Sequence, residues 1–325
     1  MHPFKKIMFA FAIGAVAAGS VQAQAANDYP NQPIRLIVPF APGGGADVTA
    51  RMVSEPLAAE LGQSIIVDNK PGGGGTIGAR IVSEAKPDGY TLLYTTPGPQ
   101  LTNPFLMKSL PYDPNTGLAP VSRIAIVPSV LVVNKSVKAD SVKELIEEAK
   151  KNPHGIRFAS AGIGASSHLS GELLKVMAGV EIDHIPYRGT GPALQDLIGG
   201  RVEMAIDSLT VYQAYIKSGD LKVLGVATPM PLDSLPGVPT IAETLPGFDS
   251  SPVNYLSAPG GTPQPILDRL NAAMNKVLAE PETKERMLKA GLLPEGNSVE
   301  EMNKLVKDEQ AKWKKVIELS GAKIE

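Results

Sequence analysis

Short apolar segments alternate with helical patterns along almost the whole chain. The apolar segments have the length of buried strands. They cover residues 34–40, 65–69, 90–95, 130–134, 157–160, 181–185, 204–207, 221–227 and 254–258. Between most of them, apolar residues recur at the three- and four-residue spacing of amphipathic helices. This alternation predicts an α/β fold with mostly parallel sheets that carry helices on both faces.

Polar residues at two helix starts have the spacing of capping boxes. These boxes are Ser141-Val142-Lys143-Glu144 and Ser298-Val299-Glu300-Glu301. A third start is predicted at Thr262-Pro263, with the threonine as N-cap and the proline in the first helical position. We expect the last helix to end at Gly321 and to pack Trp313 into the core.

The chain is predicted to cross twice between two lobes. One crossing lies near residues 128–133, after a loop rich in proline and glycine, and the other lies near residues 250–258. The prediction assigns residues 28–129 and 252–325 to the first lobe and residues 130–251 to the second. A discontinuous lobe with two crossings is the layout of a hinged binding protein.

The first 25 residues have the pattern of a cleaved secretory signal. Lys5 and Lys6 precede an apolar stretch over residues 7–18 that is too short to span a bilayer. Val21-Gln22-Ala23 and Ala23-Gln24-Ala25 are both candidate cleavage sites. The alternative is an uncleaved membrane anchor. The signal predicts export through a cleaved signal peptide and leaves a mature chain of about 300 residues, enough for two lobes with separate cores.

Composition excludes several classes of function. The 325-residue chain has a net charge of −2 and no cysteine. This charge favours neither nucleic acid nor an anionic membrane surface as a partner. Because it has no cysteine, the chain cannot be a thiol enzyme or a cysteine-ligated zinc protein. Its four histidines are scattered without the spacing of a metal site, so we expect no metal ion and no cofactor.

A glycine-rich loop follows the first predicted strand. It reads Pro39-Phe40-Ala41-Pro42-Gly43-Gly44-Gly45-Ala46-Asp47 and leads into an amphipathic segment over residues 48–61. Glycines let the backbone approach a ligand closely, and the free N–H groups of a helix start suit an anion. No Gly-Lys-Ser/Thr ends the loop, so it is not a nucleotide P-loop. A carboxylate is therefore the favoured anion.

A second glycine-rich segment covers residues 71–78. Gly73, Gly75 and Gly78 satisfy the dinucleotide pattern G-x-G-x-x-G. That reading also needs an acidic residue about 20 positions further on, and no acid lies between Asp88 and Asp113. We therefore interpret the segment as a tight turn packed near the first glycine loop.

Residues 160–168 predict a further strand–loop–helix turn, now in the second lobe. Its hydroxyls and N–H groups suit an anion held from the opposite side. Ser166 has helix capping as its alternative role. A hydrolase would need a nucleophile and a base, but Ser167 and His168 are adjacent on a helix and do not face each other. His184 with Asp183 is a conceivable completion of a triad, without support from any motif.

Further candidate ligand contacts end other strands. Arg188, next to Tyr187, offers a planar fork to a carboxylate, and its alternative is an ordinary surface ion pair. Asp207 ends a strand where open α/β sheets bind ligands, and its alternative is a helix cap. Thr95-Thr96 ends a strand of the first lobe and offers hydroxyls.

Taken together, these motifs resemble the Bug family of periplasmic solute-binding proteins, the receptors of tripartite tricarboxylate transporters. The resemblance covers essentially the whole mature chain. It is carried by residues 29–40, Pro42-Gly43-Gly44-Gly45 with Asp47, residues 68–72, 87–93 and 110–114, Ser160-Ala161-Gly162, Ser166-Ser167-His168-Leu169 and Pro186-Tyr187-Arg188-Gly189. It implies a two-lobed periplasmic binding protein fold, type II-like, and organic acids as ligands.

The resemblance also implies site residues. In that family the first glycine loop and the Ser-Ala-Gly loop grip one ligand carboxylate from opposite lobes, partly through ordered water. This role falls here on Phe40, Ala41, Gly43, Gly44, Gly45, Asp47, Ser160, Ala161 and Ser166. Ala46 stands where threonine is common, and Pro97-Gly98-Pro99 replaces a turn richer in serine and threonine. Both departures affect which acid would fit.

The expected function is that of an extracytoplasmic solute receptor with no catalytic residue. We expect a monomer that binds a small carboxylate, delivers it to the membrane permease subunits of a tripartite transporter and does not bind nucleic acid. Two alternatives are a sensing component that presents the bound acid to a sensor kinase, and an exported hydrolase.

Overall fold

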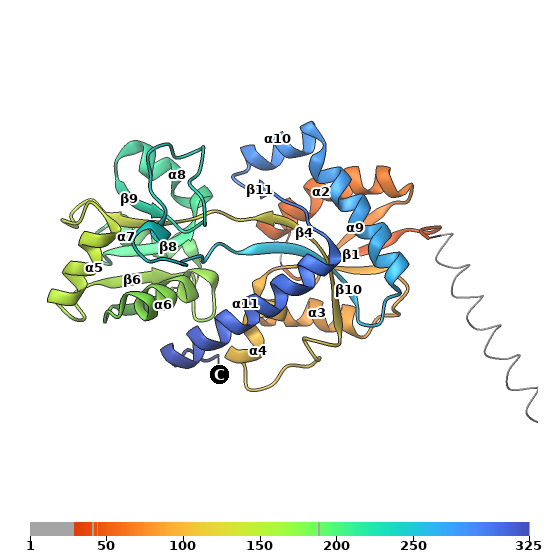
Figure 1. Cartoon of the computed structure of the whole chain (residues 1–325), viewed down its shortest axis with the longest axis horizontal. Coiled ribbons are helices and arrows are strands. Elements are labelled where there is room, and N and C mark those ends of the chain that lie inside the picture. Colours follow the sequence, from red (N-terminus) through yellow and green to blue (C-terminus); the bar gives the residue numbers. More distant parts are fainter. Residues whose placement is uncertain (1–28, 41, 44, 188, 325) are drawn as a thin grey trace, which may run out of the picture.

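The structure, a computed structural model, describes residues 29–324 apart from positions 41, 44 and 188. It contains two sheets at opposite ends of an elongated molecule (Figure 1). The predicted signal peptide, residues 1–25, lies outside the described residues. None of the described helices is long and apolar enough to cross a membrane.

The first sheet has six strands in the order β11-β4-β10-β3-β1-β2. Their bounds are β1 (Ile34–Val38), β2 (Ile65–Asn69), β3 (Thr91–Thr95), β4 (Leu118–Ile126), β10 (Val253–Pro259) and β11 (Leu293–Pro294). β1 pairs in parallel with β2 and β3, whereas β10 is antiparallel to both β3 and β4. β11 pairs antiparallel with the other edge of β4.

The second sheet has five strands in the order β7-β6-β8-β5-β9. They are β5 (Ser129–Asn134), β6 (Arg157–Ser160), β7 (Asp183–Pro186), β8 (Met204–Ser208) and β9 (Leu221–Val226). β6 is parallel to β7 and β8, and β5 runs antiparallel to β8 and β9. The predicted α/β class is confirmed, but the sheets are mixed and not mostly parallel as predicted. The strands next to the crossings, β5 and β10, each run antiparallel to both of their neighbours.

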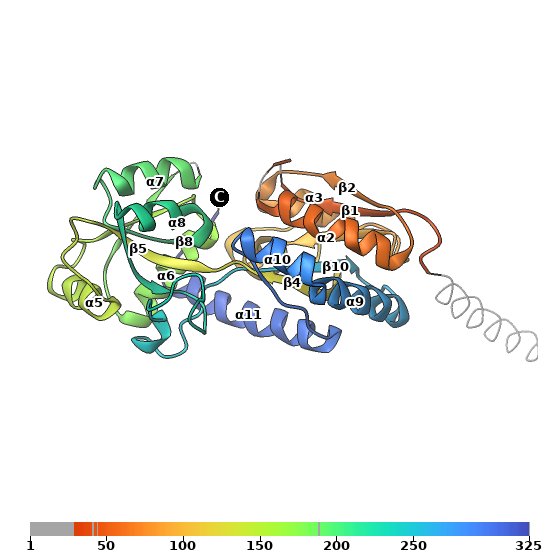
Figure 2. The same ribbon diagram turned by 90° about the horizontal axis from the view of Figure 1, so that it is seen from above.

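Helices cover both sheets (Figures 1 and 2). Around the first sheet lie α2 (Gly45–Leu61), α3 (Thr76–Ser83), α4 (Asn103–Leu106), α9 (Gln264–Ala279), α10 (Pro281–Lys289) and α11 (Val299–Ser320). Around the second lie α5 (Val142–Lys151), α6 (Ser166–Ala178), α7 (Thr190–Ile198) and α8 (Leu209–Ser218). Short turns of other helix types are η2 (Gly73–Gly75), η3 (Gly98–Thr102) and η4 (Ile241–Glu243).

The helix starts partly follow the predicted caps. Ser298 and Glu301 form a complete capping box at α11. Ser141 caps α5 through the N–H of Glu144, while the Glu144 carboxylate accepts from Asp140 and leaves the box open. The prediction at Thr262 was wrong, because its hydroxyl donates to the Pro259 carbonyl and α9 begins after Pro263.

The two faces of the first sheet pack against different helices. Leu36 lies in one core with Val53 of α2 and Leu270 of α9. The next residue, Ile37, points to the other face and packs with Ala79 of α3, as strand alternation requires. Burial on both faces explains why the strands read as continuous apolar runs.

The chain passes between the sheets through short segments. Only residues 127 and 128 separate β4 from β5, and residues 249–252 lead back into β10. α11 adds a link by packing, since its Trp313 and Ile317 share a core with Leu169 of α6. Figure 1 shows α11 running from the first sheet to α6. The numbered lobe boundaries stay a prediction.

The core role of Trp313 generates a stability prediction. Trp313→Ala should lower the free energy of unfolding by about 3–5 kcal/mol, because it removes a buried aromatic side chain from the core that joins the two sheets. Lys304→Ala, at a 77% exposed side chain of the same helix, should stay within about 0.5 kcal/mol of the parent. Urea unfolding followed by circular dichroism measures both. Equal midpoints for the two variants would contradict this role.

Candidate functional site

A cleft of about 410 Å³ lies between the two sheets. Phe40 follows β1, Thr96 follows β3, and Ile163 lies in the turn after β6, so residues after three strand ends line the cleft. Ser166 lines it from the start of α6. The carboxyl ends of strands are where open α/β sheets bind ligands. The remaining described lining residues are Gly74, Pro97, Gly98, Asn103, Gly164, Ala165, Pro252, Asn254 and Ile324.

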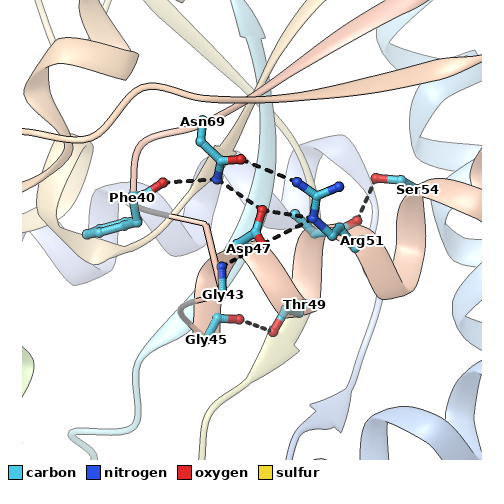
Figure 3. A network of polar contacts seen from close by, with 9 residues as sticks. Phe40, Gly43, Gly45, Asp47, Thr49, Arg51, Ser54 and Asn69 are labelled. Carbon is cyan, nitrogen blue, oxygen red and sulfur yellow. Dashed lines mark hydrogen bonds and ion pairs between the residues drawn. The ribbon is translucent and has the colours of Figure 1, made fainter.

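The first glycine loop is tied down by the carboxylate of Asp47 (Figure 3). Asp47 is only 3% exposed in the first turn of α2. Its Oδ2 accepts the Gly43 N–H at 2.9 Å, and Asn69 at the end of β2 donates to its Oδ1 at 3.0 Å. The same Asn69 amide donates to the Phe40 carbonyl. One carboxylate and one amide therefore join the loop, α2 and β2.

Arg51 completes this network on the same helix. Its Nε lies 3.0 and 3.1 Å from the two Asp47 carboxylate oxygens. The hydrogen bonds from Arg51 and from the Gly43 N–H lower the pKa of Asp47 to about 2. Since both oxygens are engaged within the protein, Asp47 positions the loop, and it does not line the cleft.

The other residues predicted in this loop differ in their placement. Phe40 lines the cleft. Gly43 adopts a left-handed φ of 78°, and its N–H donates a hydrogen bond to the Asp47 carboxylate. Gly43 and Gly45 have no atom within 4 Å of the position that a Cβ would take, so the space beside both is open. Ala41 and Gly44 lie outside the described residues.

The second glycine-rich segment is the tight turn that its sequence predicts. A Cβ on Gly75 would lie 2.9 Å from Pro99, and one on Gly78 would lie 2.8 Å from Pro39. The segment therefore packs against the start of the first glycine loop. Gly74 also lines the cleft, and its carbonyl accepts a hydrogen bond from Asn103. This contact of Gly74 with the cleft was not predicted.

The loop after β6 is held by side chains from the first turns of α6. The Ala161 N–H donates to Ser167 Oγ at 3.0 Å, and the Gly164 N–H donates to His168 Nδ1 at 3.1 Å. Ser166 is the first residue of α6 and lines the cleft. The alternative that Ser166 caps the helix is wrong, because Ala165 occupies the N-cap position. The start of α6 thus faces the cleft.

A buried histidine, His168, and a half-buried one, His184, lie behind this loop. The rings of His168 and His184 stack with centroids 4.0 Å apart, and His184 Nε2 lies 2.6 Å from Ser160 Oγ. Burial, with the positive charge of Lys175 nearby, lowers the pKa of His168 to about 4. Burial together with His168 lowers the pKa of His184 to about 3. Both rings are therefore neutral at pH 7, and His168 Nδ1 is free to accept the Gly164 N–H.

The serine and histidine residues do not form the conceivable triad. Asp183 pairs with His154 at 2.7 Å instead of orienting His184. Ser160 is 1% exposed and does not line the cleft. Among the described residues, no group of three or more histidines and carboxylates could hold a metal ion.

The remaining predicted contacts differ in their placement, and neither Tyr187 nor Asp207 lines the cleft. Thr96 lines it, whereas Thr95 is fully buried and hydrogen-bonds to Ser257 of β10. The Tyr187 hydroxyl donates to Asp196. Asp207 accepts from the Ser208 N–H and from Thr190 at the start of α7, and burial raises the pKa of its carboxyl. Arg188 lies outside the described residues.

Asn254, Asn103 and Ile324 are among the lining residues that were not predicted. Asn254 is 7% exposed in β10, and a buried amide inside an apolar strand was a signal available in the sequence. Asn103 follows a proline-rich turn. Ile324 lines the cleft at a point where its N–H donates to the Leu106 carbonyl of α4. That contact spans more than half the chain, so no local pattern indicates it.

Comparisons with known proteins place these features in a family. The model of the tripartite tricarboxylate transporter family receptor matches residues 49–322. Protein BugT of Bordetella pertussis is 36% identical over 321 residues, covering 98% of this chain and 98% of that protein.

Two solved structures are similar to this one. Rpa4515 of R. palustris with adipate has 37% identity and a TM-score of 0.77, covering 91% of this chain and 100% of that one. MatC from Rhodopseudomonas palustris with bound malate has 32% identity and a TM-score of 0.73, covering 89% and 100%. These likenesses confirm the predicted two-lobed periplasmic binding protein fold.

The Asp47 network generates a pH-dependent prediction. Asp47→Asn should lower the free energy of unfolding by about 1–3 kcal/mol at pH 7, because it weakens charge-assisted hydrogen bonds. The pKa of Asp47 is lower in the folded than in the unfolded chain, so the ionised carboxylate stabilises the folded state above pH 4. This contribution is lost as the pH falls toward 2. The difference between parent and variant in urea unfolding should therefore shrink from pH 7 to pH 3. A difference that stays constant over this range would contradict the assignment.

The neutral histidines generate a second pH prediction. Because the folded pKa of His168 is lowered, the unfolded chain binds more protons below pH 6.5, and stability should fall as the pH drops from 6.5 toward 4. His168→Gln keeps an acceptor but does not titrate, so its unfolding free energy should depend less steeply on pH. His154→Gln, at an exposed histidine, is the matched control. Equal slopes for the parent and His168→Gln would show that His168 does not carry this effect.

Proposed function

The chain belongs to the Bug family of tripartite tricarboxylate transporter receptors, and on that premise we propose that its cleft binds one small organic carboxylate for delivery to membrane permease subunits. The observation that carries the proposal is the cleft itself, which loops from both sheets line at the ends of their strands. A ligand held there would touch both lobes at once.

The polar groups around the cleft support a carboxylate. The start of α6, at Ser166, presents helix N–H groups and the positive end of a helix dipole. Thr96 and Asn254 add a hydroxyl and an amide from the first lobe. The adipate and malate of the two similar structures are carboxylates, which agrees with this chemistry.

Apolar side chains make up much of the remaining cleft wall. Phe40, Ile163 and Ile324 line it from three separate parts of the chain. Contact with these side chains would remove the carbon skeleton of the ligand from water. A small acid with an apolar body fits both halves of the lining, with its carboxylate toward α6.

Delivery to a permease requires that the bound and free forms differ. Two lobes joined by short crossing segments are suited to close as a hinge around a ligand. Hydrogen bonds from both lobes to one anion would favour the closed form. Together with the predicted signal peptide, this supports a periplasmic receptor that a permease recognises in its closed state.

The proposal predicts a strong preference for the ionised acid. Calorimetry with a panel of carboxylates, each paired with its amide and starting from adipate and malate, tests it. The acid that binds should lose about 1.5–3 kcal/mol of affinity for each charged hydrogen bond that its amide cannot make. Equal affinity for acid and amide would rule out carboxylate recognition.

A matched pair of variants tests whether this binding occurs in the cleft. Asn254→Ala should weaken the acid about tenfold, because it removes a buried amide from the cleft wall. Asn303→Ala, at an exposed asparagine of α11, should leave the affinity unchanged. Binding that both variants leave intact would place the ligand elsewhere.

A further inference from the structure

A short segment that follows α11 reaches the cleft. The helix ends at Gly321, which has a left-handed φ of 69°, and the chain then runs on to Ile324. Figure 2 shows this segment lying between the two sheets. Ile324 is half-buried and lines the cleft. We call residues 321–324 the tail segment, and its last residue forms part of the cleft wall.

The backbone of Ile324 is fixed beside the first sheet. Its N–H donates to the Leu106 carbonyl of α4 at 2.8 Å, and the residue forms a parallel β-bridge with Met107. Its side chain packs against the core that contains Leu106 and Ile317 of α11. Because backbone and side chain are both anchored, the Ile324 side chain has a defined position in the cleft wall.

The same side chain touches the loop after β6, on the other side of the cleft. A Cβ on Gly164 would lie 2.6 Å from Ile324 Cδ1 and 3.3 Å from Ile324 Cγ1. Only the bare Cα of a glycine leaves room for this contact, and the left-handed φ of 80° at Gly164 also favours glycine. Ile324 therefore fills the space where the loop after β6 meets α4.

This contact lies next to the place proposed for the ligand carboxylate. Gly164 is followed by Ala165, the N-cap of α6, and by Ser166, the first residue of that helix. All three line the cleft together with Ile324. A carboxylate at the start of α6 would therefore have its neighbouring carbon atom beside the Ile324 side chain. A branch on that carbon would compete with the isoleucine for the same space.

From this placement we propose that Ile324 determines the specificity of the cleft by excluding acids that are branched at the carbon next to the carboxylate. The inference rests on the proposed function and names the class of acid that fits, one with an unbranched CH₂ group beside its carboxylate. A CH₂ group packs on the apolar side chain. A methyl branch needs space that Ile324 occupies, and a packed wall yields such space only at a cost in free energy.

Calorimetry of the full mature chain with two pairs of dicarboxylates tests the inference. Succinate and adipate carry a CH₂ group next to each carboxylate, whereas 2,3-dimethylsuccinate and 2,5-dimethyladipate carry a methyl branch there. Because both ends of each acid are alike, the orientation of the acid in the cleft does not matter. The parent should bind each branched acid at least about tenfold more weakly than its unbranched counterpart. The quantity compared is this ratio of affinities.

Two substitutions of Ile324 should relax the exclusion. Ile324→Ala removes most of the side chain and should bring the ratio to within about threefold, and Ile324→Val should give a ratio between those of the parent and Ile324→Ala. Both should weaken the unbranched acids slightly, because less apolar surface covers them. Thermal unfolding verifies that each variant is folded, and Ile324→Val, which changes the packing least, carries the test if Ile324→Ala does not fold.

Leu319→Ala is the matched control. Leu319 is 61% exposed in the last turn of α11 and does not line the cleft, so this variant should keep the ratio of the parent. A ratio that the Ile324 variants leave unchanged, or a parent that binds branched and unbranched acids alike, would overturn the inference and leave carboxylate binding intact. A parent that binds neither succinate nor adipate would overturn it as well, whereas the proposed function fails only if no carboxylate of the panel binds.

Discussion

The whole arrangement depends on how little chain joins the two sheets. Two residues lead from β4 into β5, and a short extended segment leads back into β10. Such short connections hold the ends of β1, β3 and β6 near one another, so the loops that follow these strands meet in one cleft.

Each lobe holds the loop beside the cleft through different side chains. In the first lobe, the buried Asp47 carboxylate and the Asn69 amide bind the backbone of the glycine loop. In the second, Ser167 and the neutral His168 accept backbone N–H groups of the loop after β6. Both arrangements use a buried acceptor in the first turns of a helix to hold the loop before it. Loops held in this way lose little further freedom on binding, which favours affinity.

Much of the fold was predictable because it follows from local sequence patterns, namely the periodicity of apolar residues and the spacing of capping residues. The alternation of apolar strands and amphipathic helices indicated the α/β class, and the Ser298 and Glu301 spacing indicated the start of α11. The site was predictable only in part. Resemblance pointed to Asp47 as a ligand contact, yet its two oxygens are used within the protein, a fact that depends on Arg51 and Asn69 together. Asn254 carried a signal, because it is a polar residue inside an apolar strand. Ile324 reaches the cleft through a contact distant in sequence, so no local spacing could place it there.

Closure of the two lobes around one acid is the central claim, and a distance between the lobes tests it most directly. The chain has no cysteine, so Lys86→Cys and Glu181→Cys, both at exposed positions on different lobes, accept spin labels at two unique sites. Double electron–electron resonance should show a shorter and narrower distance distribution once a carboxylate that calorimetry has identified saturates the protein. An unchanged distribution at saturation would mean that the cleft is a rigid pocket and that the hinged receptor account is wrong.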